Sequence, residues 1–207
     1  MEILRESIFD TFISPPKGHE SEVRSVALSS DGRLLASGSA DKRTLLWTRD
    51  TLSGEWVVSE GEGGGHTGAV VALEFGGKRL VSGSYDRTVR VWEAGGAAGA
   101  ERKLAGHTHW VMGVCWVGES VVASASYDRT ARMWSVSTGE CLRVMREHTD
   151  RVTSIAFSSV TGLLSTSSFQ VLAKLVSVSQ PSPPRLPSLP RLPPCPPPCL
   201  PFLGSIL

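Results

Sequence analysis

Short runs of alternating apolar and polar residues recur along the first three-quarters of the chain. In residues 79–92, a β-type run ends in a stretch of small and polar residues, after which Val89 and Val91 occupy alternate positions. A period of two places such residues on one face of a strand. Asp86, within the polar stretch, favours a turn because its side chain can accept a hydrogen bond from the backbone two residues on. The pattern predicts a strand, a tight turn and a second strand.

The same pattern returns at a regular spacing. Residues 124–134 almost repeat residues 82–92, and residues 37–47 are a looser copy. In all three segments an aspartate precedes a tryptophan by six residues, and the tryptophans are 45 and 42 residues apart. A period of about 40–45 residues indicates an array of similar supersecondary units.

Each unit contains four short strand-like runs separated by turn residues. In the first unit, these runs are residues 23–28, residues 34–37, a run that ends at Trp47, and residues 55–58. The second and third units follow the same order, and a fourth begins near residue 147 with two matching runs. Four consecutive strands joined by turns predict an antiparallel meander in each unit.

The pattern stops inside the fourth unit. Gln170 stands where the aspartate is expected, Val176 stands where the tryptophan is expected, and 11 of the 13 prolines occur from Pro181 onward. Proline-rich sequence supports neither a strand ladder nor a helix, so this tail is predicted to be disordered or polyproline-like. The chain is thus divided into an N-terminal extension with a predicted strand (1–14), a repeat region (15–176) and a Pro/Leu-rich tail (177–207).

Composition narrows the range of functions. Of the 207 residues, 41% are hydrophobic, and 21 Lys and Arg nearly balance 20 Asp and Glu, which leaves a net charge of +1. A charge near zero gives no general attraction for nucleic acid or for an anionic membrane. No run approaches the roughly 18 apolar residues of a membrane-spanning helix, and we expect no secretory signal. The four cysteines do not form a disulfide framework, so we expect an intracellular protein, cytoplasmic or nuclear.

The recurring residues resemble those of the WD40 repeat family. A Gly-His pair, such as residues 65–66, is followed about 20 residues later by an aspartate and then by a strand-ending tryptophan. The similarity covers about residues 16–166. It implies an all-β fold, a WD40 β-propeller that is incomplete, with about three and a half to four blades of four antiparallel strands. The implied blades are residues 18–60, 65–105, 106–146 and, incomplete, 147–176.

The resemblance also implies a four-residue hydrogen-bond network in each complete blade, whose third member is a Ser or Thr on the second strand. A buried His, Ser, Asp and indole N–H can satisfy one another, and an unpaired member would cost about 1–3 kcal/mol. The implied tetrads are His19, Ser37, Asp41 and Trp47; His66, Ser82, Asp86 and Trp92; and His107, Ser124, Asp128 and Trp134.

A Ser, His and Asp set could also be a hydrolytic triad, but we favour the structural interpretation. A triad is needed once, in a cleft with an oxyanion site, whereas this set occurs three times beside a tryptophan. His107 and His109 have no cysteine or carboxylate at metal-ligand spacing. The sequence therefore predicts a non-enzymatic protein with no metal and no cofactor.

The family presents side chains on one rim of the propeller, just before each turn aspartate and at the start of each first strand. The resemblance therefore implies a surface for a protein or peptide partner, with aromatic side chains as its anchors. Trp110 is the strongest single candidate. The candidate partner-binding residues are Trp110, Tyr85, Tyr127, Arg24, Met112 and Arg151.

We therefore predict a scaffold for protein–protein interaction. The alternative is an RNA-associated subunit of a ribonucleoprotein complex, suggested by the arginines that accompany Tyr85 and Tyr127, although the net charge disfavours nucleic acid. Three units and a fragment do not close a seven-bladed ring. We accordingly hypothesise a truncated isoform or gene model of a longer propeller, whose open end would allow self-association.

Overall fold

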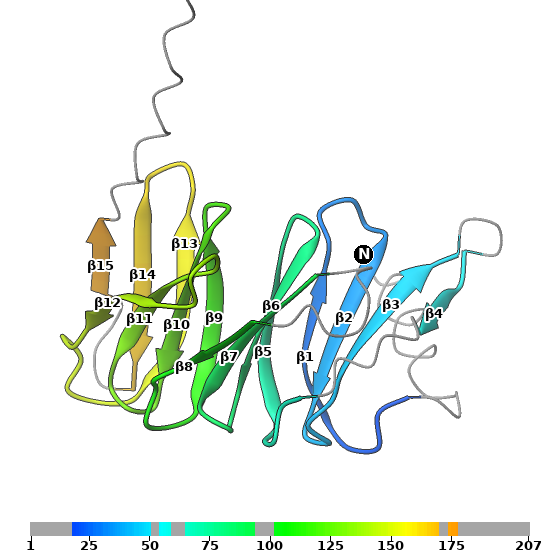
Figure 1. The fold of residues 1–207 in the computed structure, drawn as a ribbon, viewed down its shortest axis with the longest axis horizontal. Helices are drawn as coiled ribbons and strands as arrows, with labels where there is room; N and C mark the ends of the chain where they lie inside the picture. The colour runs from blue at the N-terminus through cyan, green and yellow to red at the C-terminus, as the bar shows by residue number, and fades with distance from the viewer. Residues whose placement is uncertain (1–17, 51–53, 59–64, 94–101, 170–173, 178–207) are drawn as a thin grey trace, which may run out of the picture.

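The computed structural model describes residues 18–50, 54–58, 65–93, 102–169 and 174–177. Within these ranges it contains fifteen β-strands and no helix. The strands form four antiparallel sheets that stand side by side in a row (Figure 1). The prediction of an all-β, propeller-like fold with about four blades is confirmed.

Each sheet is a meander in which strands pair in chain order. Sheet 1 contains β1 (Val23–Leu28), β2 (Leu34–Ser39), β3 (Thr44–Arg49) and β4 (Trp56–Val58). Sheet 2 contains β5 (Val70–Gly76), β6 (Arg79–Ser84), β7 (Thr88–Glu93) and β8 (Arg102–Ala105). Sheet 3 contains β9 (Val111–Val117), β10 (Val121–Ser126), β11 (Ala131–Ser135) and β12 (Cys141–Met145). Sheet 4 contains β13 (Val152–Ser158), β14 (Leu163–Ser168) and β15 (Lys174–Ser177).

The turn between the second and third strands is built around an aspartate. In sheet 2, the Asp86 carboxylate accepts a hydrogen bond of 2.9 Å from the backbone N–H of Thr88. Arg87, between them, has φ of 71°, in the left-handed region that non-glycine residues adopt only where the surroundings support it. Lys42 and Arg129 occupy the same position in sheets 1 and 3, with φ of 73° and 69°. The aspartate therefore fixes the geometry of this hairpin in sheets 1, 2 and 3.

Neighbouring sheets pack face to face, with large apolar side chains of one sheet against small residues of the preceding sheet. A Cβ atom added at Gly38 would lie 2.6 Å from Val70 Cγ1, and one added at Gly83 would lie 2.9 Å from Val111 Cγ1. The first strands of sheets 2, 3 and 4 each contribute three apolar residues to this packing. We call each set a leading stripe: Val70, Leu73 and Phe75; Val111, Val114 and Trp116; and Val152, Ile155 and Phe157.

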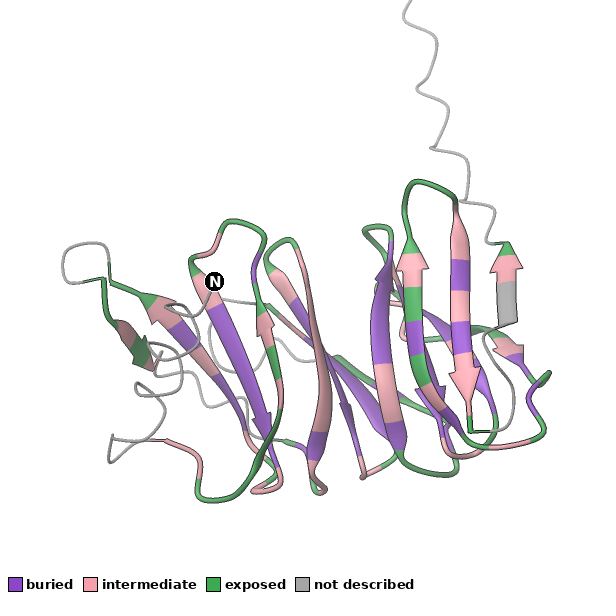
Figure 2. Cartoon of the chain, turned by 180° about the vertical axis from the view of Figure 1, so that it is seen from behind, coloured by how far each residue is buried: buried purple, intermediate pink, exposed green. Residues whose placement is uncertain are grey.

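These stripes lie in the interior of the row. Val70, Val111 and Val152 are fully buried, and the buried positions concentrate on the middle strands (Figure 2). Burying an aliphatic or aromatic side chain of this size contributes roughly 1.5–3 kcal/mol. The contacts between sheets, together with hydrogen bonding within each sheet, therefore hold the row together.

The row does not close on itself, because sheet 1 and sheet 4 lie at its opposite ends in both views (Figures 1 and 2). In sheet 4, Val176 pairs with Leu164 in the register in which Trp134 pairs with Val122 in sheet 3. Valine thus replaces the strand-ending tryptophan, as the sequence alignment of the units predicts. Gln170, the predicted extension (1–14) and residues 178–207 of the predicted tail lie outside the described residues.

Replacing Gly83 with leucine is expected to lower the free energy of unfolding by about 1–3 kcal/mol, because the new side chain would overlap the leading stripe of sheet 3. Urea denaturation measures the change. Val160→Ala is the control: Val160 is 94% exposed, so its truncation should change stability by less than about 0.5 kcal/mol. Equal stability of Gly83→Leu and the native chain would contradict the packing described above.

Candidate functional site

The structure brings the predicted tetrad residues together inside sheet 2. The indole N–H of Trp92 donates to Ser82 Oγ over 2.9 Å, and Ser82 Oγ lies 2.8 Å from His66 Nε2. His66 Nδ1 lies 2.7 Å from Asp86 Oδ2. Because the Ser82 oxygen already accepts from Trp92, its own proton is assigned to His66 Nε2, and His66 Nδ1–H donates to Asp86. The result is one directed chain of hydrogen bonds from indole to carboxylate.

The same chain occurs in sheets 1 and 3. In sheet 3 the distances are 2.8 Å from Trp134 to Ser124, 2.7 Å from Ser124 to His107 and 2.8 Å from His107 to Asp128. In sheet 1 the corresponding contacts join Trp47, Ser37, His19 and Asp41, each at 2.8 Å. In sheet 4, His148 Nε2 lies 2.7 Å from Thr166 Oγ1, which occupies the serine position.

The environment of each tetrad favours an ionised aspartate. Burial alone would raise the pKa of Asp86, but hydrogen bonds donated by His66 and by the Thr88 hydroxyl lower it well below its ordinary value. The pKa of Asp128 is lowered in the same way by His107 and Thr130. Burial lowers the pKa of His107 despite its hydrogen bond to Asp128. Sheet 3 therefore holds a neutral imidazole between an ionised carboxylate and a serine.

The tetrads contain the Ser–His–Asp hydrogen bonds of a catalytic triad, but their serines are not accessible. Ser82 and Ser124 are fully buried, and each hydroxyl is already engaged by a tryptophan and a histidine. A substrate carbonyl would have to displace one of these partners to reach the oxygen. Among the described residues, no group of three or more His, Cys, Asp or Glu side chains is placed to hold a metal ion. The described ranges also contain no helix able to cross a membrane.

Aromatic side chains form a continuous cluster on the rim where these turns lie. Tyr85 stacks on Trp110 with ring centroids 4.2 Å apart and planes inclined by 13°. Trp110 lies 5.7 Å from Tyr127, and His109 lies within 5.8 Å of both rings. Tyr127 in turn lies 6.3 Å from Phe169 in an edge-on arrangement. We call Tyr85, His109, Trp110, Tyr127 and Phe169 the rim cluster; it extends across sheets 2, 3 and 4.

Backbone hydrogen bonds place the rim cluster on rigid elements. The N–H of Tyr127 donates to the carbonyl of Trp110 over 3.0 Å, and the N–H of Tyr85 donates to the carbonyl of Ala69 over 2.9 Å. Each tyrosine directly precedes its tetrad aspartate. The rings of Tyr85 and Tyr127 therefore project from turns whose backbone is held by the tetrad aspartates.

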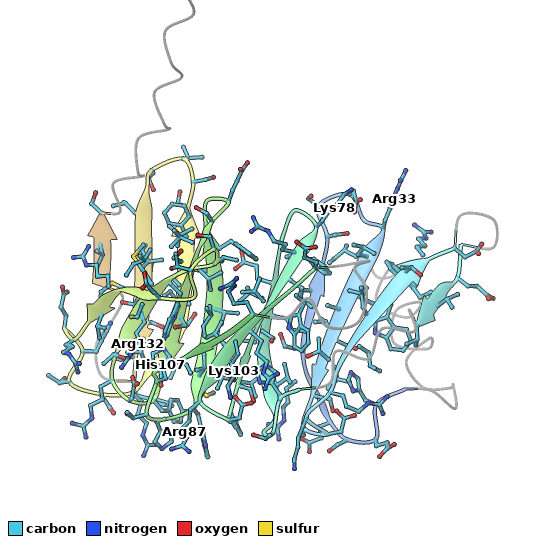
Figure 3. The ribbon with its side chains drawn as sticks, viewed as in Figure 1. Arg33, Lys78, Arg87, Lys103, His107 and Arg132 are labelled. Atoms are coloured by element: carbon cyan, nitrogen blue, oxygen red, sulfur yellow. The ribbon has the colours of Figure 1, made fainter. Side chains whose placement is uncertain are left out.

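The rim cluster is accessible and bordered by positive charge. Trp110 is 39% exposed and Phe169 is 67% exposed. The Arg151 guanidinium lies 5.2 Å from the centre of the Tyr127 ring, in a cation–π contact. Arg87 and Arg129 are exposed in the same turns as the two tyrosines. Figure 3 shows Arg87 at the edge of the sheets opposite to the edge that carries Arg33 and Lys78.

Four of the six predicted partner-binding residues come together here: Trp110, Tyr85, Tyr127 and Arg151. Arg24 lies instead on sheet 1, where it forms an ion pair of 2.6 Å with Glu22. Met112 is partly buried in β9, two residues beyond Trp110. Sequence reasoning missed His109 and Phe169. Phe169 could have been found, because it precedes Gln170 as Tyr127 precedes Asp128.

The sequence profile described as "WD domain, G-beta repeat" matches residues 11–48, 56–93, 100–135 and 139–169. These segments cover more than half of the chain. The chain belongs to the WD40 family. Each matched repeat is offset from the sheets by one strand: residues 56–93 contain β4 of sheet 1 followed by β5, β6 and β7 of sheet 2. A WD40 repeat in this chain therefore contributes to two neighbouring blades.

Relatives are similar over a single repeat. The Intraflagellar transport protein 122 homolog of Xenopus tropicalis is 53% identical over 38 residues, and that of Homo sapiens is 50% identical over 38 residues. Each match covers 18% of this chain and 3% of the relative. Among solved structures, the computationally designed Ika4 protein is similar with a TM-score of 0.65 and 28% identity, over 79% of this chain and 95% of that chain.

Ser82→Ala is expected to destabilise the protein by about 1–3 kcal/mol, because it leaves the Trp92 indole N–H and the His66 ring without their shared partner. Urea denaturation measures the loss. Ser159→Ala, in an exposed turn, is the matched control and should be nearly neutral. If Ser82→Ala were as stable as the control, the tetrad would have no structural role.

The lowered pKa of Asp86 predicts acid sensitivity. A carboxyl whose pKa is lower in the folded state contributes stability above its ordinary value of 3.8, and that stability is lost as pH falls below this value. We expect Asp86→Asn to melt about 3–10 °C lower than the native chain at pH 7, because it weakens the hydrogen bonds to the carboxylate. Between pH 4.5 and pH 2.5, its melting temperature should fall less steeply than that of the native chain. Parallel melting curves across this range would contradict the assignment.

Proposed function

We propose that this WD40 protein is a non-enzymatic scaffold that binds a protein or peptide partner at the rim cluster. The observation that supports the proposal is the stacked aromatic surface centred on Trp110, which is 39% exposed although it packs against Tyr85. Large aromatic side chains with part of their surface free are typical anchors of protein interfaces.

The rigidity of the rim supports binding without reorganisation. The turns that carry Tyr85 and Tyr127 are tied to the first strands by backbone hydrogen bonds and to the tetrads by Asp86 and Asp128. A surface that is already ordered loses little conformational entropy when a partner docks. A modest contact area centred on Trp110 would therefore suffice for a specific complex.

The charges around the cluster suggest the chemistry of the partner. Arg151 contacts the Tyr127 ring, and Arg87 and Arg129 are exposed in the turns that carry Tyr85 and Tyr127. Asp86 and Asp128 instead bond within the tetrads. A partner segment with an apolar or aromatic side chain flanked by carboxylates would complement both features. We propose such a segment as the preferred ligand.

We also propose a cellular compartment and a kind of assembly for the scaffold. Cys115 and Cys141 are free thiols, and their being unpaired supports a reducing intracellular compartment. The relatives are named for intraflagellar transport, which makes a transport assembly one setting to test. The similarity is only one repeat long, so it supports the scaffold role more than that pathway.

Trp110→Ala is expected to weaken binding of selected peptides at least about tenfold, because it removes the central anchor. The peptides are selected by display on the native chain, and their affinities are measured by fluorescence polarisation. Leu142→Ala is the control, since Leu142 is an exposed apolar residue on β12 and not part of the rim cluster. Unchanged affinity in Trp110→Ala would contradict the proposed site.

The alternative function, binding of RNA, is distinguished in the same experiment. Stacked aromatic rings beside arginines can also bind single-stranded bases. RNA binding would appear as affinity for a labelled oligonucleotide that falls steeply with salt and is reduced by Arg87→Ala and Arg129→Ala. Peptide binding that depends on Trp110, without such salt-dependent RNA binding, would support the protein scaffold.

A further inference from the structure

The first strand of sheet 1 carries an apolar stripe that no sheet among the described residues covers. Val23, Val26 and Leu28 are 44%, 58% and 58% exposed. Their register is that of the leading stripes, because Val26 pairs with Ser37 just as Val114 pairs with Ser124 in sheet 3. In sheets 2 to 4 the same positions pack against the preceding sheet. Sheet 1 therefore has a fourth leading stripe, and no preceding sheet among the described residues packs against it.

The other end of the row presents the matching surface. On the far face of sheet 4, Ser154 pairs with Ser167 and Ala156 pairs with Ser165, and Ser154 and Ala156 are exposed. Figure 2 shows the exposed positions along β13. We call these four residues the trailing face. They are small. Most residues that receive a leading stripe elsewhere are also small: Gly38 and Ala36 in sheet 1, Gly83 and Ala72 in sheet 2, and Gly113, Cys115, Ala123 and Ala125 in sheet 3. Glu74 and Val81 of sheet 2 are the larger members of this set.

The interface between sheets 3 and 4 shows how the two surfaces would meet. Ile155, in the leading stripe of sheet 4, lies 3.3 Å from a Cβ built on Gly113 of sheet 3. Gly113 has the register of Ser154, since Gly113 pairs with Ala125 and Ser154 pairs with Ser167. Val26 has the register of Ile155. A leading stripe from sheet 1 placed on the trailing face would therefore bring Val26 against Ser154.

We propose that two copies of this chain associate head to tail, each seating the leading stripe of its sheet 1 on the trailing face of the other's sheet 4. Within one copy the two surfaces lie at opposite ends of the row and cannot meet (Figure 1). Two rows of the four described sheets give a ring of eight, and propellers typically contain four to eight blades. Two identical head-to-tail contacts then close the ring and cover the leading stripe of every described sheet.

The charge of the chain does not oppose this assembly, because a net charge of +1 gives little repulsion between copies. The dimer contact does not involve the proposed partner surface. The rim cluster lies at the edges of sheets 2 to 4, whereas the contact uses the leading stripe of sheet 1 and the trailing face of sheet 4. Head-to-tail closure would place two rim clusters on the same rim of the ring. A partner with two binding segments would then gain affinity through the local concentration of the second site.

The test measures the mass of the full 207-residue chain in solution by sedimentation velocity over a range of concentrations. We expect the mass to level at two chains. Val26→Glu and Ser154→Lys, each alone, should raise the concentration at which half of the chains are dimeric by roughly 100-fold, because a charge would be buried without a partner at both contacts. Leu142→Glu is the matched control: Leu142 is 55% exposed on β12, away from both end faces, and its replacement should leave the dimer unchanged.

A mixture of the two charge variants provides the decisive comparison. Val26→Glu retains a native trailing face, and Ser154→Lys retains a native leading stripe. One contact in the mixed dimer is therefore native, and the other places the introduced glutamate of one chain against the introduced lysine of the other. We expect the mixture to recover dimers that neither variant forms alone at the same concentration. Circular dichroism confirms that each variant is folded.

Three results would overturn the proposal. A native chain that melts cooperatively but stays monomeric would mean that the stripe is left open or is covered by a segment of its own chain. A mass that rises continuously with concentration would mean open head-to-tail chains instead of a closed ring. A native dimer that persists in both folded charge variants would place the contact on another surface.

Discussion

The hydrogen bonds of one aspartate per repeat connect the interior of each complete blade to its surface. One oxygen of Asp86 accepts from the backbone of Thr88 and holds the turn, while the other accepts from His66 and from the N–H of Thr67. This turn also places Tyr85 on the rim. Because a buried carboxylate is tolerated only when it is well hydrogen-bonded, the network specifies a single arrangement of strand, turn and neighbouring loop. The proposed binding surface is thus a consequence of how the interior satisfies its polar groups.

Packing between the sheets depends on a contrast in side-chain size rather than on charge. Glycine at positions 38 and 83 lets the next sheet approach until its valines touch the backbone. Between sheets 2 and 3, Glu74 departs from this rule: its carboxylate accepts a hydrogen bond of 3.1 Å from the backbone N–H of Trp116, and burial raises the pKa of Glu74. Burial of this carboxylate therefore costs stability as it ionises, so that interface relies on its apolar contacts.

The sequence predicted the parts of the fold that recur and missed those that depend on how sheets are placed. Local or periodic signals could be predicted from the sequence. They are the alternation within strands, the Asp-to-Trp spacing and the replacement of the strand-ending tryptophan by Val176. The stacking of Tyr85 on Trp110 could not be predicted from the sequence. These rings come from different sheets and meet only at the angle set by inter-sheet packing. Likewise, Val26 has the same sequence pattern as Val114, and only the absence of a neighbouring sheet among the described residues makes it exposed.

The offset between repeat and sheet affects how such a chain can change in evolution. If residues 56–93 were deleted as a whole, β4 would be lost together with β5, β6 and β7, and β8 would follow β3 directly. β8 pairs with β7 as β4 pairs with β3, so it could complete sheet 1 in place of the lost strand. Gain or loss of a complete repeat would then alter the number of blades while every blade kept its outer strand. Duplication of a repeat could lengthen the propeller, and deletion of a repeat could shorten it, without leaving an unfinished sheet in its interior.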